Sequence, residues 1–294
     1  MNASRLVGIL LWVGGLVLGT VTDTTPERPA LYRNGYRVLA GDFHVHGFLG
    51  DGVLPPWDLI REARRRGLDV IALTNHNQML AMRIAERMPR KVRDVLLLPG
   101  EELTAPGFHL AVVGIARAVD WTQPVVAVVD AVHKQGGVAI AAHPVGGYGK
   151  AFDDAALAVL DGVEAAHPLL HVTEKGYWDL TGFYQRAASR HPHLAAIGSS
   201  DFHHMAPLGL CRTYLLAREL SADAVIEAIR QGRTVACDAE GRSYGAPQLV
   251  HLMAEDCRRS AIAGSARGRI RSRLPMVMAW TGLLILVLLG PRDR

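Results

Sequence analysis

Short apolar runs alternate with helical patterns over most of this 294-residue chain, and this alternation constrains its fold more than any other feature. The runs have the composition of strands buried on both faces, as in parallel sheets. They lie at residues 69–74, 95–98, 109–114, 138–142, 162–166, 194–197, 213–216 and 234–237. About seven strand–helix repeats predict a parallel sheet with helical crossovers that closes into a barrel. With 49% hydrophobic and 20% charged residues, the chain can fill such a core.

The first strand, which begins near residues 37–40, leads into a polar segment with two histidines. Side chains alternate along a strand, so Asp42, His44 and His46 point to one face. Two imidazoles held two residues apart can bind one metal ion. Asp51 follows in a glycine-flanked loop, from which its carboxylate can bend back to the same pocket. Two ordinary histidines at a strand end would give the same local pattern, so the rest of the chain decides between these interpretations.

Similar side chains stand at the ends of the later strands. The residues at these positions are His76, Glu102, His143, Asp201 and His203, and His109 stands at the entrance of a strand. The C-terminal ends of barrel strands converge on one pocket. Histidines and carboxylates without cysteine are typical of sites for Zn²⁺, Mn²⁺ or Fe²⁺. The sequence therefore predicts a divalent metal centre at the mouth of the barrel.

The order of these residues resembles the pattern of the PHP (polymerase and histidinol phosphatase) superfamily of metal-dependent phosphoesterases. The matching segments are Asp42-Phe43-His44-Val45-His46, Asp51-Gly52, Thr74-Asn75-His76, Gly100-Glu101-Glu102, His109, Ala142-His143-Pro144 and Gly198-Ser199-Ser200-Asp201-Phe202-His203. The resemblance covers residues 38–240, and the spacing is also similar to that of the carbaryl-hydrolase-like metallohydrolase branch. There are two departures: Asn75 replaces the usual aspartate, and Ser199 is an added residue, so that Ser200 takes the serine position.

The resemblance implies a distorted (β/α)7 TIM-like barrel, an α/β fold, flanked here by N- and C-terminal hydrophobic helices. It also implies two or three divalent metal ions (Zn, Mn or Fe). Carried over, the ligands of the first ion are His44, His46, Glu102 and Asp201. Glu102 bridges to a second ion held by His109 and His143, and a third ion is held by Asp51, His76 and His203.

The function implied by the resemblance is hydrolysis of a phosphate mono- or diester by attack of a metal-bridged hydroxide. Glu102, His143 and Asp201 then act in catalysis as ligands of the ions that hold the hydroxide. His204 or His167 is a candidate for protonating the leaving oxygen. Two alternatives stay open: a hydrolase of carboxylic or carbamic esters that uses the same site, and a catalytically silent membrane-bound metal-binding module.

The expected partners are a small-molecule phosphoester or ester and a lipid bilayer. Lys150, in a glycine-rich loop, and Arg212 are candidates for binding the substrate. The net charge of +4 comes mostly from arginines near the C-terminal end, which argues against a dedicated nucleic-acid surface. Cys211, Cys237 and Cys257 are odd in number and widely spaced, a pattern that indicates neither a disulfide framework nor a zinc site.

Both ends of the chain are apolar, over residues 6–21 and 274–290. Each stretch is close to the minimum length of a spanning helix. The first is alternatively a cleaved signal peptide, because Arg5 precedes it and Val17-Leu18-Gly19 is a possible cleavage site. The expected organisation is an N-terminal membrane helix and linker (1–29), a metallohydrolase domain (30–250), a basic linker (251–273) and a C-terminal transmembrane helix (274–294).

The expected location is a membrane of the bacterial inner-membrane type. Six arginines lie shortly before the second apolar stretch, namely Arg258, Arg259, Arg267, Arg269, Arg271 and Arg273. Only Arg292 and Arg294 follow it. Positive charge is enriched on the cytoplasmic side of membrane helices, which favours a cytoplasmic catalytic domain. If the first apolar stretch is a signal anchor, the domain lies on the outer side instead, and this alternative stays open.

Overall fold

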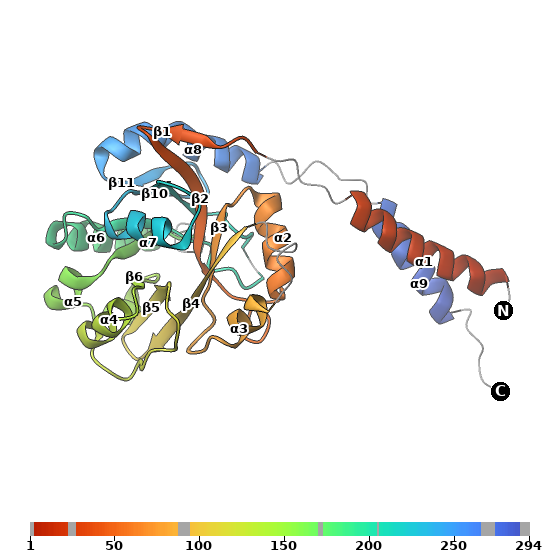
Figure 1. The fold of residues 1–294 in the computed structure, drawn as a ribbon, viewed down its shortest axis with the longest axis horizontal. Helices are drawn as coiled ribbons and strands as arrows, with labels where there is room; N and C mark the ends of the chain where they lie inside the picture. Colours follow the sequence, from red (N-terminus) through yellow and green to blue (C-terminus); the bar gives the residue numbers. More distant parts are fainter. Residues whose placement is uncertain are drawn as a thin grey trace. The chain divides into compact units, whose positions relative to one another are not determined.

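The computed structural model describes residues 3–22, 28–87, 95–169, 173–204, 206–265 and 274–288. The chain divides into two compact units. The larger one, Pro29–Ser265, is an α/β unit with a nearly closed, barrel-like sheet, and the smaller one joins the two apolar ends of the chain. The predicted fold class is therefore confirmed, and each unit is described below by itself (Figure 1).

The sheet of the larger unit is mixed rather than wholly parallel. Its strand order is β11-β10-β9-β2-β3-β4-β5-β6-β7-β8, and β1 pairs with the outer part of β2. The strands are β1 (Leu31–Arg33), β2 (Tyr36–Val45), β3 (Val70–Leu73), β4 (Leu96–Ala105), β5 (Phe108–Val113), β6 (Val138–Ala141), β7 (Gly162–Ala166), β8 (Ala195–Gly198), β9 (Arg212–Ala217), β10 (Thr234–Cys237) and β11 (Ser243–Gly245). Pairs β2–β3, β3–β4, β6–β7 and β7–β8 are parallel, whereas β5 and β9 run antiparallel to both neighbours.

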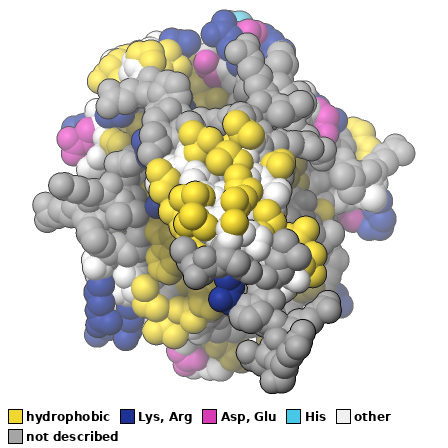
Figure 2. Space-filling model, turned by 90° about the vertical axis from the view of Figure 1, so that its right-hand side faces the viewer, with side chains coloured by type: hydrophobic (Ala, Val, Ile, Leu, Met, Phe, Trp, Pro, Cys, Tyr) yellow, Lys and Arg dark blue, Asp and Glu magenta, His cyan; other side chains and the backbone are white. Residues whose placement is uncertain are grey.

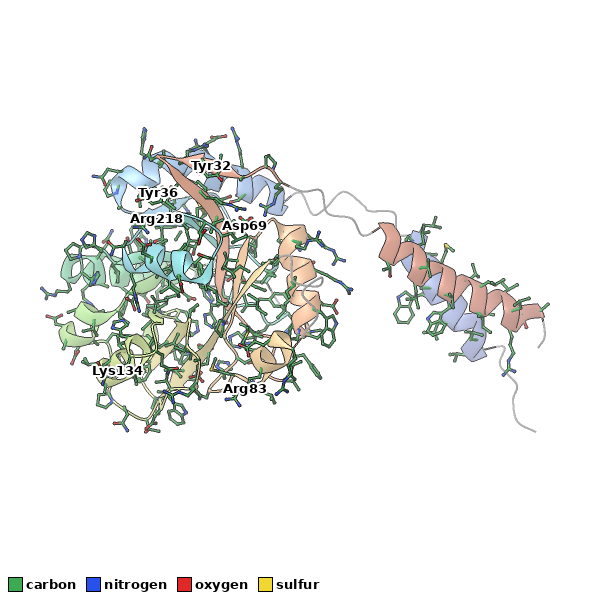
Figure 3. All side chains as sticks on the ribbon, viewed as in Figure 1. Tyr32, Tyr36, Asp69, Arg83, Lys134 and Arg218 are labelled. Carbon is green, nitrogen blue, oxygen red and sulfur yellow. A yellow bond between two sulfur atoms is a disulfide. The ribbon has the colours of Figure 1, made fainter. Side chains whose placement is uncertain are left out.

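The helices lie outside the sheet, and the labelled Lys134 and Arg218 are among the exposed charged side chains of this outer layer (Figures 1 and 3). They are α2 (Pro56–Arg66), α3 (Leu80–Glu86), α4 (Val125–His133), α5 (Asp154–Val159), α6 (Glu174–Arg190), α7 (Ala222–Arg230) and α8 (Pro247–Ser265), with a 3-10 turn η2 (Gly146–Gly149). Helix α2 begins and ends as its sequence predicts: Pro56 occupies the first turn, and Gly67 closes the helix in a left-handed conformation (φ 73°).

The barrel is closed by side-chain bonds between β8 and β9. The Thr213 hydroxyl donates to the carbonyl oxygen of Gly198 at 2.9 Å and accepts from the Gly198 N–H at 2.9 Å. A Cβ atom at position 198 would lie 2.4 Å from the carbonyl oxygen of Arg212, so only glycine permits this approach. Beneath the mouth, buried apolar side chains from the strands and from α7 pack in one cluster that includes Leu39 and Phe43.

Helix α8 is attached to the sheet by a disulfide between Cys237, at the end of β10, and Cys257. The expectation that the cysteines form no disulfide was therefore wrong. Twenty residues separate the two cysteines in sequence, and only the fold brings their Cα atoms to 5.3 Å. Residues 251–265, assigned from the sequence to a basic linker, form most of α8, and Met253 is buried there. Cys211 is a free, buried thiol.

The smaller unit consists of helices α1 (Ala3–Thr22) and α9 (Leu274–Leu288), which pack against each other. Glycines lie at their contact: a Cβ atom on Gly15 would lie 2.6 Å from the carbonyl oxygen of Pro275, and one on Gly282 would lie 2.3 Å from the backbone nitrogen of Trp12. Among the described residues, one helix, α1, is long and apolar enough to cross a membrane, and α9 is shorter. Hydrophobic side chains dominate the foreground of Figure 2.

Candidate metal centre

At the mouth of the barrel, four buried polar atoms without a hydrogen-bond partner face one another. They are Nε2 of His44, Nε2 of His46, Oε2 of Glu102 and Oδ1 of Asp201. Each histidine nitrogen lies 3.2–3.3 Å from each of the two carboxylate oxygens. A buried polar atom without a partner costs free energy, so four of them facing one point require an explanation.

A single cation at that point would satisfy all four atoms. Ligands held about 2.0–2.1 Å from one ion in tetrahedral geometry lie about 3.3 Å from one another. The observed nitrogen–oxygen separations of 3.2–3.3 Å fit this spacing. The residues also combine imidazole and carboxylate ligands, which suit borderline divalent metals. His44, His46, Glu102 and Asp201, the predicted ligands of the first ion, therefore fit such an ion.

The second oxygen of Glu102 faces a different pair of histidines. Its Oε1 lies 2.7 Å from Nδ1 of His109 and 3.3 Å from Nε2 of His143. Oε2 lies beside His44 and His46 and also 2.8 Å from Nδ1 of His76. The two oxygens of this carboxylate thus face different histidines, which is the arrangement of a bridging residue. His109 reaches this group because β5 runs antiparallel: the start of β5 lies at the same end of the barrel as the end of β4.

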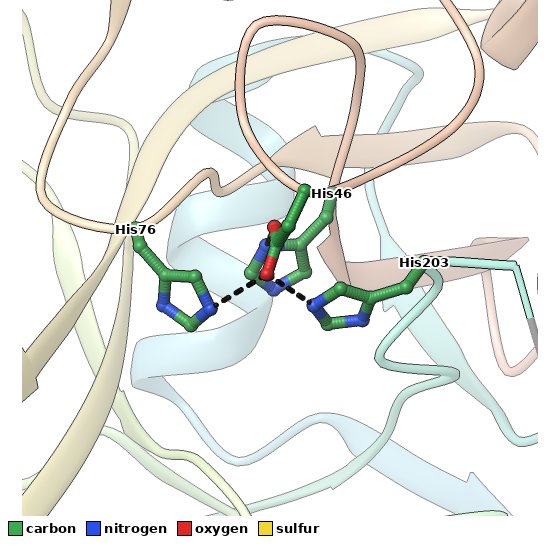
Figure 4. Close-up of side chains that lie close together, drawn as sticks. His46, His76 and His203 are labelled. Carbon is green, nitrogen blue, oxygen red and sulfur yellow. Dashed lines mark hydrogen bonds and ion pairs between the residues drawn. The ribbon is translucent and has the colours of Figure 1, made fainter.

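A third group surrounds the carboxylate of Asp51. Oδ2 of Asp51 lies 2.9 Å from Nε2 of His203 and 3.2 Å from Nε2 of His76. Oδ1 lies 3.0 Å from Nδ1 of His46, which the sequence analysis had assigned to the first group alone. Figure 4 shows the three rings converging on one carboxylate. His46 therefore stands between the first and third groups, with one ring nitrogen toward each.

The loop that presents Asp201 is held from below by Asp42. The Asp42 carboxylate accepts from the Ser200 N–H, the Ser200 hydroxyl and the Gly209 N–H. Ser200, predicted to take the serine position of the motif, thus donates twice to Asp42. Asp201 itself adopts a positive φ of 47°, a conformation that non-glycine residues adopt at some cost. The Asn75 amide oxygen accepts from the Gly47 N–H at 2.7 Å, so this departure from the family pattern fixes the backbone beside His46.

The electrostatics of the pocket favour positive charge at its centre. Burial opposes protonation of His44, but the carboxylates of Asp201, Glu102 and Glu164 outweigh it and raise the pKa of His44 well above its ordinary value. Burial also disfavours ionised Glu102, yet His44 and His109 hold the pKa of Glu102 well below the usual range. The pKa of Asp201 is lowered by His44 in the same way, despite burial. The carboxylates thus stay ionised and demand compensating positive charge, which divalent cations supply.

The remaining predicted site residues lie around this centre with different surroundings. His204 is exposed, next to His203. Lys150 is exposed at the end of η2 and lines a surface groove together with Pro144 and Trp178. Arg212 is buried, and its guanidinium donates to the carbonyl oxygens of Gly209 and Arg66. Because its guanidinium is buried and bonded to backbone oxygens, the structure gives no support to the prediction that Arg212 contacts the substrate.

Of two buried residues that contact the predicted ligands, Glu164 was missed by sequence reasoning, and His167 was predicted in a different role, as a proton donor to the leaving oxygen. Glu164 lies in the middle of β7, and His167 lies just beyond the end of that strand. Nε2 of His167 lies 3.3 Å from Oδ2 of Asp201, while its Nδ1 accepts from the Leu169 N–H. The N–H of His167 is therefore directed to Asp201, and not to a position where it could protonate a leaving oxygen. The signal for Glu164 was a single acidic residue within the apolar run of residues 162–166.

A family model described as PHP-associated matches residues 185–234 of the chain. A crystal structure of a two-domain protein from Bacteroides vulgatus, which contains a predicted PHP-like metal-dependent phosphoesterase, is similar to this chain. Its TM-score is 0.59 and its identity 22%, over 82% of this chain and 74% of that one. No curated protein matches the chain.

Two further solved structures match less closely. A protein from Bifidobacterium adolescentis, described as a metal-dependent phosphoesterase, has a TM-score of 0.44 and 19% identity, over 65% of this chain and 96% of that one. An amidohydrolase from Chromobacterium violaceum with bound sulfate and no metal has a TM-score of 0.41 and 17% identity, over 55% and 87%. The resemblance to the PHP superfamily is confirmed, and that to the carbaryl-hydrolase-like branch stays a prediction.

Proposed function

We propose that this chain, which has the PHP fold, is a metal-dependent hydrolase that cleaves a phosphate mono- or diester. One observation carries the proposal: four buried atoms without hydrogen-bond partners converge at the mouth, and the second oxygen of one of these residues, Glu102, faces a further pair of histidines. A bridging carboxylate between two cation sites is what in-line displacement at phosphorus uses. The ions, when bound, would lower the pKa of a water and neutralise phosphoryl oxygens.

The chain's own residues have separate tasks in this proposal. His44, His46, Glu102 and Asp201 would hold one ion, and Glu102, His109 and His143 a second. Asp51, His76 and His203, joined by His46, would hold a third. Asp51 is about half exposed and therefore lies on the solvent side of the centre, where a substrate enters. His204 is also exposed beside this group, so it is the better candidate for giving a proton to the leaving oxygen.

We also propose that the apolar helix α1 tethers the chain to a membrane. Its 18-residue window Ala3–Thr20 has a mean hydropathy of 1.6 and is only 11% buried within the structure. An exposed apolar surface of this kind is stabilised by lipid rather than by water. The contact of α9 with α1 would place both apolar ends of the chain in the same bilayer.

The test is an assay of the purified full-length chain in detergent with Mn²⁺, Zn²⁺ or Fe²⁺ added back after chelation. Naphthyl phosphate, a phosphodiester panel and naphthyl carbamate are compared side by side. We expect metal-dependent release of naphthol from the phosphate and not from the carbamate. Turnover of the carbamate alone would assign the chain to ester or carbamate hydrolysis, and bound metal without any turnover would indicate a silent metal-binding module.

A further inference from the structure

A buried carboxylate beneath the centre connects two of the ligand groups. Glu164 is fully buried, and each of its oxygens makes one short contact. Its Oε1 lies 2.8 Å from Nδ1 of His44, and its Oε2 accepts from the backbone N–H of His143 at 2.6 Å. His44 belongs to the first group of ligands and His143 to the second. One side chain therefore contacts a residue of each group from outside both.

The contact with His44 decides which ring nitrogen faces the cation site. When a cation is bound at Nε2, the imidazole is neutral and its one proton lies on Nδ1, from which it is donated to the carboxylate of Glu164. Nε2 then keeps its lone pair toward Glu102 and Asp201, where it has no hydrogen-bond partner. A metal-bound histidine usually donates its other N–H to a carboxylate in this way, and the contact fixes both tautomer and ring orientation.

The contact with His143 acts on the backbone instead. His143 has a φ of 30°, outside the region that residues with a side chain adopt readily. Such a conformation persists only where the surroundings hold it. The bond from its N–H to Glu164 is short, and it sets the direction in which the side chain carries Nε2 toward Oε1 of Glu102. Without that bond the ligand would be free to relax away from the second group.

We propose that Glu164 is a positioning residue that fixes the ligand geometry of both cation sites at once. This inference rests on the proposed metal centre but not on the identity of the substrate. The consequence is specific: a change at one side chain that touches neither ion weakens binding of both. A residue that merely supported the barrel would lower stability and leave the coordination geometry of the remaining folded protein unchanged.

The test compares Glu164→Gln with Glu101→Gln in the full-length chain. Glutamine keeps the size of the side chain but has one acceptor and one donor group, so in either orientation one contact of Glu164 is reversed. Glu101 is a matched control, because it is equally buried, on strand β4, and its carboxylate accepts from the Val119 N–H. Outer-shell changes of this type cost about 10- to 100-fold in metal affinity.

Two readouts separate positioning from folding. Competition with a chelator should show about 10- to 100-fold weaker binding at two sites in Glu164→Gln, and the visible spectrum of the Co²⁺-loaded protein should change. Neither should change in Glu101→Gln. Glu164→Asp, which restores both acceptors on a shorter side chain, should recover part of the affinity. If Glu164→Gln does not fold, the metal affinities of Glu164→Asp are compared with those of the wild type instead. Unchanged affinities, or loss at one site alone, would overturn the proposal. Hydrolysis by the wild type tests the function separately.

The disulfide carries a second, independent inference about the compartment in which the larger unit works. Cys237 and Cys257 are both fully buried and joined, while Cys211 is free. Disulfides form and persist in oxidising compartments and are rare in the cytosol, where thiols are kept reduced. The bond fastens α8 to β10, close to where the chain leaves the larger unit.

The arginine distribution that favoured a cytoplasmic domain is weaker evidence in the folded protein, because two of the six arginines belong to helix α8. Arg258 and Arg259 lie on α8, where both pair with Glu255. The arginines left on the domain side, outside the larger unit, are Arg28, Arg267, Arg269, Arg271 and Arg273, and those beyond the two apolar segments are Arg5, Arg292 and Arg294. Five against three is too small a difference to fix an orientation. The disulfide therefore decides, and we infer that the larger unit lies on the oxidising side of the membrane.

Counting thiols in the full-length protein tests this inference. Cells expressing the chain are quenched in acid, which prevents oxidation after lysis, and the denatured protein is treated with a polyethylene-glycol maleimide. We expect one labelled cysteine without reductant and three after reduction. The Cys237→Ser variant, which frees Cys257, should show two under both conditions. Three labelled cysteines in the unreduced wild type would overturn the inference, as would an inactive alkaline phosphatase fused after Ser265, since that enzyme folds only where disulfides form.

Discussion

Replacing Glu102 by glutamine is expected to reduce metal-dependent hydrolysis by about 10³-fold or more. The substitution keeps the side-chain volume but removes the charge and one of the two acceptor oxygens that face separate groups of histidines. Stabilisation by a bound cation contributes several kcal/mol to reactions of this class, and each 1.36 kcal/mol corresponds to about a factor of ten in rate. The measurements are the rate on an aryl phosphate and the number of ions bound per chain, which should fall by at least one.

The neighbouring residue provides the control for this substitution. Glu101 has the same side chain, is equally buried and lies on the same strand, but its carboxylate accepts from the Val119 N–H, away from the mouth. Glu101→Gln should therefore keep activity within a few-fold of the wild type, although its stability falls. Equal loss in the two variants would mean that general disruption of β4, rather than the ligand role of Glu102, explains the effect.

Removing the metal ions is expected to lower the melting temperature by about 8–16 °C. A ligand present at a thousand times its dissociation constant stabilises the folded state by about 4 kcal/mol. For a domain of 150–250 residues, each kcal/mol shifts the melting temperature by about 2–4 °C. The sign follows from the structure: without cations, the carboxylates of Glu102 and Asp201 are buried with only the nearby imidazoles to compensate their charge, so their desolvation is compensated less well than with divalent ions bound.

The measurement is thermal unfolding of the full-length chain with and without chelator, followed by readdition of Mn²⁺ or Zn²⁺. Readdition should restore the original melting temperature. The Glu102→Gln variant should respond much less to the chelator, because its site is already impaired. A wild-type melting temperature that does not change on chelation would show that the converging atoms are not a cation site.

Most of the predicted ligands could be singled out because they follow an apolar run within a few residues. A polar residue at the end of a buried strand is locally visible, and His76, Glu102, His143 and Asp201 were found in this way. His109 is an instructive case, because it stands at the start of its strand and would point away from the mouth in a wholly parallel barrel. The antiparallel direction of β5 brings it to the right end, and apolar periodicity contains no information about strand direction.

The missed features depend on partners that are distant in sequence. Glu164 could be seen as an acidic residue in an apolar run, but nothing local indicates that its partners are His44 and the backbone of His143. The pairing of Cys237 with Cys257 likewise requires α8 to fold back on β10. Residues 251–265 were predicted as part of a linker because arginines are prominent in this segment of the sequence. Only a small part of the surface of α8 is buried, including Met253 and Cys257, and this apolar contact was not recognised from the sequence.

The first and second groups of predicted ligands differ in the sequence distance between their members, and this difference has a consequence for folding. Glu102 and His109 are seven residues apart on one hairpin, so their half of the second group assembles from a local contact. The first group needs the start and the end of the barrel together: the Ser200–Asp42 bond that supports Asp201 spans 158 residues. Closing so long a loop is entropically slow. Capture of an ion by the first group therefore marks the completion of the barrel, and a nascent chain that ends before Asp201 has only part of the centre.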